Sequence, residues 1–288
     1  MSDPALDYVH ETLLACQERG LNLRASVESL ARLASTRAQP IAAPSAAPTP
    51  APKAAPSAAP KSIEPASPRV HGDYLRIAPL TGRKSERLEA MRNTVLACVK
   101  CQHLLKSRTQ VVFGVGNPEA ELMFVGEAPG EDEDHQGEPF VGKAGQLLTK
   151  IIETMGFDRA DVFIANVLKC RPDMPPGASG NRKPRPDEMA TCFPYLREQI
   201  EIIRPRVLVA LGATAMEGLT GQSLPMARLR GRWHDVEGTP LMATYHPAYL
   251  LRNQALSEKR KVWEDMLLVL EKLGRPITEK QRTYFQRK

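Results

Sequence analysis

"LMFVGEAPGEDEDHQGEPFVGKAGQLL", residues 122–148, joins a strand pattern to a helix pattern through a loop rich in glycine and acidic side chains. The apolar run at 122–125 is typical of a strand that is covered on both faces. Helical spacing begins near Gly142. In α/β proteins, the loop after the carboxyl end of such a strand is where ligands bind. Because the loop contains no lysine before Lys143, a phosphate site of the Gly-Lys-Ser/Thr type is a poor match.

The alternation of strand and helix patterns continues along the chain. Apolar, β-rich runs occupy residues 120–126, 161–168, 206–212 and 240–245, and helical spacing occupies residues 85–96, 143–155, 187–203, 213–219 and 256–273. This order favours a parallel sheet with helices on both faces. We therefore predict an α/β protein, a three-layer α/β/α sandwich on a four-stranded parallel sheet. Its ligand site should lie at the carboxyl ends of the strands, beside Glu127, Asn166 and His246.

The first 68 residues differ in composition from the rest of the chain. Residues 39–68 contain nine prolines and ten alanines, a composition that cannot form a core, so we predict a disordered, extended linker. Residues 1–38 show the leucine spacing of a short helical segment that is too short to be stable alone. This segment is either a docking module for a protein partner or a loosely folded appendage. Residues 69–288 are predicted to form the domain that carries the site.

Length and charge limit the class of protein further. The chain has 288 residues, of which 42% are hydrophobic, enough for a sizeable core. No apolar run approaches the roughly 18 residues of a membrane helix, and no signal-peptide pattern opens the chain, so we expect a cytoplasmic protein with no membrane partner. We also expect a monomer. Residues 1–68 hold six basic and six acidic side chains, which places the whole net charge of +6 in residues 69–288. A basic domain indicates a polyanionic partner, and nucleic acid is one candidate.

Four of the five cysteines are candidate metal ligands. Cys98 and Cys101 form a CxxC motif, whereas Cys170 and Cys192 lie at the two ends of a segment rich in arginine, proline and glycine. That segment cannot form a core of its own and needs an anchor. The spacing leaves three interpretations open: an iron–sulfur cluster, a zinc site, or ordinary core cysteines. Cys16, in the N-terminal segment, is most simply a packing residue.

Two further residues near the strand ends are unusual for their positions. Asn166 lies within a strand pattern, although asparagine is depleted in strands, so its amide is expected to be bonded either to the backbone or to a ligand. Phe140 lies in the glycine-rich loop, where it is either an ordinary core residue or a stacking platform for a ligand.

The segment that follows the last predicted strand carries a second group of candidates. His246 is either a solvated or capping residue at the strand end or a catalytic residue. Leu250 and Leu251, with Arg252 behind them, lie on a loop that begins with a proline. Two exposed leucines beside a basic residue form a plausible wedge for opening a base stack. The alternative is that they pack against the helix predicted at 256–273.

Together these motifs resemble the family 4 uracil-DNA glycosylases, the iron–sulfur members of the uracil-DNA glycosylase superfamily. The likeness covers about residues 85–274 and consists of CVKC, the loop 126–148, ANVLKCRP, GNRKPRPDE with a following cysteine, LVALGATA and YHPAYLLR, in that order. The resemblance implies an α/β/α sandwich on a four-stranded parallel sheet. It also implies a DNA repair enzyme that flips uracil out of single- or double-stranded DNA and hydrolyses its N-glycosidic bond, leaving an abasic site.

The same resemblance assigns roles to the candidate residues. Asn166 would read the polar edge of uracil, Phe140 would stack on its ring, and His246 would stabilise the departing uracil anion near O2. Glu127 and Ala128 would lie against the base and its glycosidic bond. Leu250, Leu251 and Arg252 would serve as wedge and phosphate contacts. A 4Fe–4S cluster would be held by Cys98, Cys101, Cys170 and Cys192.

The chain departs from its wider superfamily at Ala128. Relatives in the first glycosylase family carry an aspartate there that is thought to activate water, so here the base is either Glu127 or Glu133. Glu133 alternatively excludes the thymine methyl group. Residues 171–191 contain no histidine for covalent attack on the sugar, and no lysine occupies a matched position for a Schiff base, so a monofunctional hydrolase is expected. The main alternative is a non-catalytic DNA-binding or scaffold protein; a zinc-dependent nucleotide hydrolase would need ligands at the strand ends that are missing.

Overall fold

The computed structural model describes residue 78 and residues 81–175, 177–178 and 180–286. The predicted N-terminal segment 1–38, the predicted linker 39–68 and Cys16 lie outside the described residues. None of the described helices combines the length and the apolar character that a bilayer-spanning helix requires.

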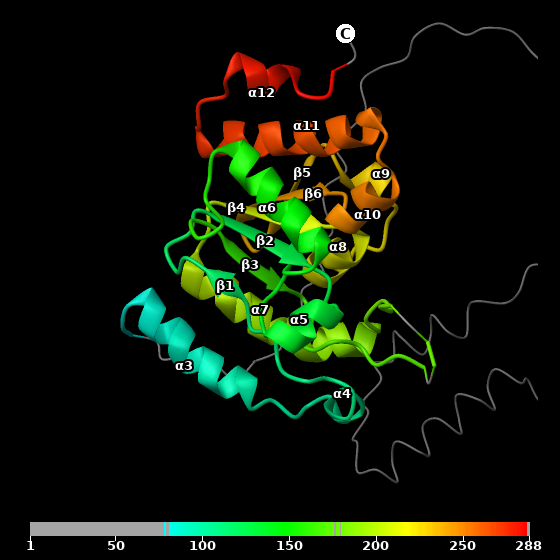
Figure 1. Ribbon diagram of the computed structural model, residues 1–288. Helices are drawn as coiled ribbons and strands as arrows, with labels where there is room; N and C mark the ends of the chain where they lie inside the picture. The colour runs from blue at the N-terminus through cyan, green and yellow to red at the C-terminus, as the bar shows by residue number, and fades with distance from the viewer. Residues whose placement is uncertain (1–77, 79–80, 176, 179, 287–288) are drawn as a thin grey trace, which may run out of the picture. The chain divides into compact units, whose positions relative to one another are not determined.

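A six-stranded mixed sheet forms the centre of the described part (Figure 1). Its strands are β1 (Val115–Gly116), β2 (Leu122–Gly126), β3 (Phe163–Asn166), β4 (Val207–Leu211), β5 (Trp233–Val236) and β6 (Thr239–Thr244). The order across the sheet is β1-β3-β2-β4-β6-β5. Strands β3, β2, β4 and β6 are mutually parallel, while β1 and β5 pair antiparallel at the two edges.

The prediction of a four-stranded parallel sheet was therefore right for the centre and incomplete at the edges. All four predicted strands are the parallel ones, and their residues are buried on both faces over most of their length. Strand β1 has only two residues, and β5 is a partly exposed stretch, WHDV, so neither shows the apolar run that reveals a central strand. At Gly116 a Cβ atom would lie 1.9 Å from the Val162 carbonyl oxygen, so only glycine permits this close approach of β1 to β3.

Helices cover both faces of the sheet. They are α3 (Lys84–Leu96), α4 (Gln102–Leu105), α5 (Glu131–Gln136), α6 (Lys143–Met155), α7 (Pro186–Ile203), α8 (Ala213–Thr220), α9 (Met226–Leu229), α10 (Pro247–Arg252), α11 (Leu256–Leu273) and α12 (Glu279–Thr283). Helices α6 and α11 pack their apolar side chains on one face, and α3, α7 and α8 pack theirs on the other. This arrangement is the three-layer α/β/α sandwich, with the sheet between the two helix layers in Figure 1.

The register of the parallel strands determines where the candidate residues meet. Gly126 pairs with Asn166, and Leu211 pairs with Thr244, so the four strands end at one common edge. Glu127 follows β2 directly, and His246 lies two residues beyond the end of β6. The candidate residues therefore lie at the carboxyl edge of the sheet, where α/β proteins bind ligands.

Candidate active site and cysteine cavity

Asn166, Gly126 and Phe140 meet at the end of strands β2 and β3. Asn166 is only 2% exposed, yet its Oδ1 atom has no hydrogen-bond partner among the described residues. A Cβ atom on Gly126 would lie 2.4 Å from this Oδ1 and 2.5 Å from the Phe140 ring, so the glycine keeps the space between them open. A buried acceptor without a protein partner is unusual and calls for a donor from a ligand or a water molecule.

Phe140 is held in this position by an uncommon backbone conformation. Its φ of 56° lies in the left-handed region, which costs free energy for a bulky side chain and is found most often at functional sites. Gly145, in the first turn of α6, packs directly on it: a Cβ atom there would lie 1.8 Å from the Phe140 carbonyl oxygen. The phenyl ring lies 5.6 Å from the His246 ring, centroid to centroid. An amide, a phenyl ring and an imidazole therefore lie together at this edge of the sheet.

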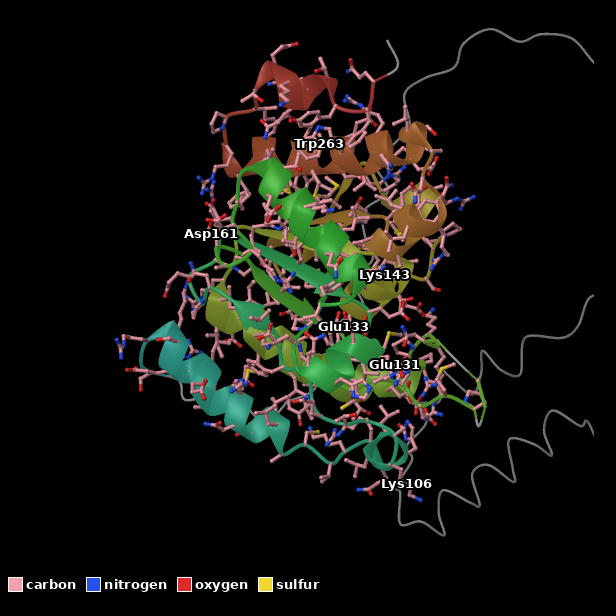
Figure 2. The ribbon with its side chains drawn as sticks, in the orientation of Figure 1. Lys106, Glu131, Glu133, Lys143, Asp161 and Trp263 are labelled. Atoms are coloured by element: carbon pink, nitrogen blue, oxygen red, sulfur yellow. The ribbon has the colours of Figure 1, made fainter. Side chains whose placement is uncertain are left out.

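Glu133 shapes the glycine-rich loop. Its Oε2 accepts a hydrogen bond from the Gly130 N–H at 3.0 Å, and its Oε1 accepts from the N–H groups of Val141 at 2.9 Å and Gly142 at 3.0 Å. One carboxylate therefore caps the start of α5 and ties it to the residues before α6, the region where Glu133 is labelled in Figure 2. With three backbone donors on its two oxygens, Glu133 has little capacity left to activate a water molecule.

Glu127, directly after β2, is half-buried. Burial raises the pKa of its carboxyl group, while the Thr214 hydroxyl and the Lys183 ammonium act in the opposite direction. Lys183 also pairs with Glu217, with 2.6 Å between Nζ and Oε2. Ala128, the next residue, is partly buried and packs against the apolar core on the α7 side. Of the two candidate bases, Glu127 is the one whose oxygens accept no main-chain hydrogen bond from the part of the loop that the structure describes.

His246 precedes α10 and caps it. Its Nδ1 atom accepts a hydrogen bond from the Ala248 N–H at 3.1 Å. Burial, with a smaller contribution from the Arg252 charge, lowers the pKa of His246 to about 4. The imidazole is therefore neutral at pH 7, and because Nδ1 accepts, its single proton is on Nε2. His246 can donate one hydrogen bond from Nε2 without carrying a positive charge.

The segment predicted as a wedge loop is the short helix α10. Leu250 is 5% exposed and packs inside, whereas Leu251 is 40% exposed. Arg252, at the end of the helix, is exposed as well. The structure therefore separates the two leucines, because only Leu251 presents its side chain at the surface.

All four predicted metal ligands line one cavity, which we call the cysteine cavity. Cys98 and Cys101 lie between α3 and α4, Cys170 lies beyond β3, and Cys192 lies within α7. Each of three sulfurs accepts one hydrogen bond: Cys170 from Arg108 Nη1 at 2.9 Å, Cys98 from the Tyr195 hydroxyl at 3.2 Å, and Cys192 from the Lys169 main-chain N–H at 3.2 Å. Donors directed at sulfur are typical of sites that hold thiolates.

The spacing of the four sulfurs bears on the choice between zinc and a larger centre. A metal ion needs at least three ligand atoms close together. Within the described part of the chain, His103, Asp173 and Glu188 are the one set of three side chains whose ligand atoms all lie within 4.8 Å of one another. No three of the four thiol sulfurs therefore lie within 4.8 Å of one another. Tetrahedral zinc, with bonds of about 2.3 Å to sulfur, would need them about 3.8 Å apart.

The His103 group is an ion-pair network that the sequence analysis missed. Arg182 donates hydrogen bonds to both Asp173 and Glu188, and Arg185 lies against His103 and Glu188. Burial would raise the pKa of Glu188, but hydrogen bonds from Arg182, the Arg185 N–H and His103 outweigh it and lower the pKa to about 2. Two arginines leave no need for a cation here. The network joins α4, the segment after Cys170, and α7.

Lys169 was also missed, because a lysine at the end of an apolar run usually reaches solvent. Here it is 1% exposed and lines the cysteine cavity. Burial lowers its pKa to about 8, and the neighbouring Cys192 and Cys170 act in the opposite direction. No pattern in the sequence distinguishes this lysine from a surface one.

Comparison with known proteins places these features in a family. A profile of the uracil DNA glycosylase superfamily matches residues 113–267. The type-4 uracil-DNA glycosylase of Thermotoga maritima is 45% identical over 186 residues, which are 64% of this chain and 93% of that protein. The type-4 enzyme of Archaeoglobus fulgidus is 41% identical over 208 residues, 69% of this chain and 98% of that protein. A type-5 uracil-DNA glycosylase of Pyrobaculum aerophilum is 27% identical over 190 residues, 55% of this chain and 81% of that protein.

Proposed function

The chain belongs to the type-4 uracil-DNA glycosylases of the uracil-DNA glycosylase superfamily, and we propose that it reads an extruded uracil with Asn166 and Phe140. Its activity is the hydrolysis of the N-glycosyl bond of uracil in DNA, and its role is DNA repair. The observation that carries the assignment of the pocket is the buried Asn166 Oδ1 atom, which has no partner among the described residues and lies beside an aromatic ring.

Recognition of the base rests on matching donors and acceptors. Uracil presents an N–H at N3 and a carbonyl oxygen at O4, so Asn166 can accept from N3–H with Oδ1 and donate to O4 with Nδ2. Cytosine presents an acceptor at N3 and an amino group at C4, which would leave both amide atoms of Asn166 facing like groups. Rejection is strong when a buried polar group is left unpaired. Phe140 supplies the stacking surface for the ring.

The base must leave the duplex before it can reach this pocket. Leu251 is the residue placed to fill the space that the base vacates, because it is exposed on α10, the helix that His246 caps. Arg252, next to it, is available for a phosphate of the same strand. Leu250 supports α10 from inside the domain and has no direct contact with DNA in this proposal.

Bond cleavage builds positive charge on the sugar and negative charge on the uracil. The Nε2–H of the neutral His246 donates to O2, where the negative charge develops, and so favours the transition state over the ground state. Glu127, ionised above its raised pKa, accepts a proton from the water molecule that attacks C1′ of the sugar. Glu133 keeps the loop in shape instead of acting as the base.

The residues of the cysteine cavity fit a 4Fe–4S cluster held by Cys98, Cys101, Cys170 and Cys192. The four cysteines line one cavity, three of their sulfurs accept hydrogen bonds, and Arg108 and Lys169 supply positive charge nearby. These features suit an anionic four-thiolate centre. When bound, the cluster would cross-link three segments of the chain that are distant in sequence.

The decisive experiment changes the hydrogen-bond donors and acceptors that the side chain at position 166 presents to the base. Wild-type protein and Asn166→Asp are incubated with oligonucleotides that contain uracil, cytosine or thymine at one position, and abasic sites are cleaved with alkali. The wild type should excise only uracil, and Asn166→Asp should lose uracil activity and gain a measurable rate on cytosine. Asn117→Asp, an amide change beside Val162 at the opposite edge of the sheet, is the matched control and should behave as wild type. A wild-type protein that binds these oligonucleotides without cleaving them would point to the scaffold alternative.

A further inference from the structure

We propose that Lys169 is a positioning residue that couples the cysteine cavity to Asn166, so that base selection depends on what the four cysteines hold. The inference rests on the proposed function, since it takes Asn166 as the base-reading residue and the cavity as the site of an anionic centre. Lys169 itself lies behind the pocket and is assigned no contact with uracil.

The ammonium end of Lys169 is fixed inside the domain. Nζ donates a hydrogen bond to the main-chain carbonyl of Asn166 at 3.0 Å and another to Gln199 Oε1 at 2.5 Å. Gln199 is itself completely buried, and its Nε2 donates to the Phe113 carbonyl at 3.0 Å. The lysine is therefore part of a buried chain of hydrogen bonds that runs from the end of β3 to α7 and on to the segment before β1.

The other end of Lys169 belongs to the cysteine cavity. Its main-chain N–H donates to Cys192 Sγ at 3.2 Å, its neighbour in the sequence is Cys170, and the residue lines the same cavity. A single residue thus contacts a metal-ligand sulfur with its backbone and the base-reading residue with its side chain.

The buried ammonium group of Lys169 needs negative charge nearby. A buried ammonium is strongly unfavourable unless an opposite charge lies close by. Within the described part of the chain, no ion pair joins Lys169 to a carboxylate, and the cavity that Lys169 lines is the one that holds the four cysteines. A cluster held by four thiolates is anionic and would place negative charge on this side of the lysine.

The effect on Asn166 follows from its position at the end of β3. Its main chain pairs with Gly126 on one side, and its carbonyl accepts the Lys169 hydrogen bond. Its side-chain Oδ1 has no partner until a base arrives, so the direction of the amide depends on how firmly the main chain is held. A displacement of about 1 Å in such a group can cost about 10²-fold in rate. Lys169 therefore sets the precision of base reading without entering the pocket.

The test uses the full-length, cluster-loaded protein and Lys169→Met, which keeps the length of the side chain but removes its charge and donors. Leu196→Ala, in the same helix as Gln199 and completely buried, serves as the control for loss of stability alone. Four quantities are measured: iron content, the reduction potential by film voltammetry, single-turnover rates on uracil and cytosine substrates, and affinity for the same DNA with a non-cleavable abasic-site analogue.

Lys169→Met should retain its iron, and its reduction potential should become more negative because a positive charge has been removed beside the centre. Its rate on uracil should fall about 10- to 100-fold and its preference for uracil over cytosine should narrow, with DNA affinity unchanged. The proposed coupling between the cysteine cavity and Asn166 would be overturned if Lys169→Met kept the wild-type rate and selectivity or the wild-type reduction potential. It would also be overturned if Leu196→Ala showed the same reduced preference for uracil over cytosine. Wild-type excision, measured alongside, tests the proposed function separately.

A second variant decides the matter if Lys169→Met does not fold. Gln199→Met leaves the ammonium and its charge in place but removes one of its two acceptors. The rate on uracil should then fall by a smaller factor, again with narrowed selectivity and retained iron. Wild-type selectivity in a folded Gln199→Met enzyme would exclude the proposal that this hydrogen-bond chain positions Asn166.

Discussion

His246 should be neutral and protonated on Nε2 throughout the physiological pH range, and this state should be visible in the stability of the protein. Burial lowers the pKa of this imidazole from 6.5 to about 4. The charge is then disfavoured in the folded state by about 3 kcal/mol relative to the unfolded chain, at 1.36 kcal/mol per pKa unit. Above pH 7.5 both states are neutral and the difference has no effect.

The sign of the effect follows from proton uptake. As the pH falls below 6.5, the unfolded chain binds a proton at His246 and the folded protein does not, so stability is lost until the pH falls below about 4. At pH 5 the loss from this residue alone is about 2 kcal/mol. Because other groups titrate too, the informative quantity is the difference in unfolding free energy between the wild type and His246→Ala.

That difference should shrink by about 2 kcal/mol between pH 8 and pH 5. It can be measured by urea unfolding, with the fluorescence of Trp233 and Trp263 as the signal. Glu127→Gln provides a control of opposite sign: the pKa of Glu127 is raised, so its burial costs stability at high pH and the cost is relieved as the pH falls. Long-range ¹H–¹⁵N spectra should locate the His246 proton on Nε2. A wild-type to His246→Ala difference that is constant from pH 8 to pH 5 would refute the neutral-donor mechanism.

Two further changes test the other parts of the site. Cys98→Ala should lose iron and visible absorbance together, because one of the four ligands is removed and Tyr195 loses its acceptor; a variant that keeps about four irons per chain by iron assay would contradict the assignment of the cavity. Leu251→Ala should leave thermal stability unchanged and slow excision more at U·A pairs than at U·G mismatches or in single strands, because an unpaired base costs less to extrude. Leu250→Ala should instead lower the free energy of unfolding by about 2–5 kcal/mol and slow excision equally on all three substrates. If single-turnover rates show the substrate-dependent loss in Leu250→Ala and the uniform loss in Leu251→Ala, Leu250 is the wedge and Leu251 is not.

The central strands and helices could be predicted from the sequence, because their hydrophobic spacing matches the structure that they adopt in the fold. Strands β2 and β4 are continuous apolar runs, β3 and β6 are largely so, and α6 and α11 have the bounds that helical spacing predicted. The edge strands were not accessible. Strand β1 is two residues long, and β5 is too polar to stand out, so both depend on pairing with a strand that is already present.

Some residues of the candidate site could likewise be predicted from the sequence, and others could not. Residues that break a local rule, such as Asn166 in a strand, could be singled out from the sequence, and the structure brings Asn166, Phe140 and His246 to one edge of the sheet. Leu250 and Leu251 could not be separated, since the helical turn that buries one and exposes the other appears only in three dimensions. Lys169 obeys every local rule for a surface lysine, and only the packing of α7 over it encloses its charge.

The positions of the four cysteines along the chain also determine when, during translation, the cysteine cavity can be completed. Its four sulfurs come from three segments, and 94 positions separate Cys98 from Cys192 along the chain. At about 5–20 residues per second, a ribosome needs roughly 5–20 s to travel that distance. Throughout this interval the first two thiols have emerged without their partners, free to react with oxidants or stray metal ions. For the proposed cluster, delivery of iron and sulfur would have to wait until most of the domain has been translated, and the nascent chain would have to be kept reduced until then.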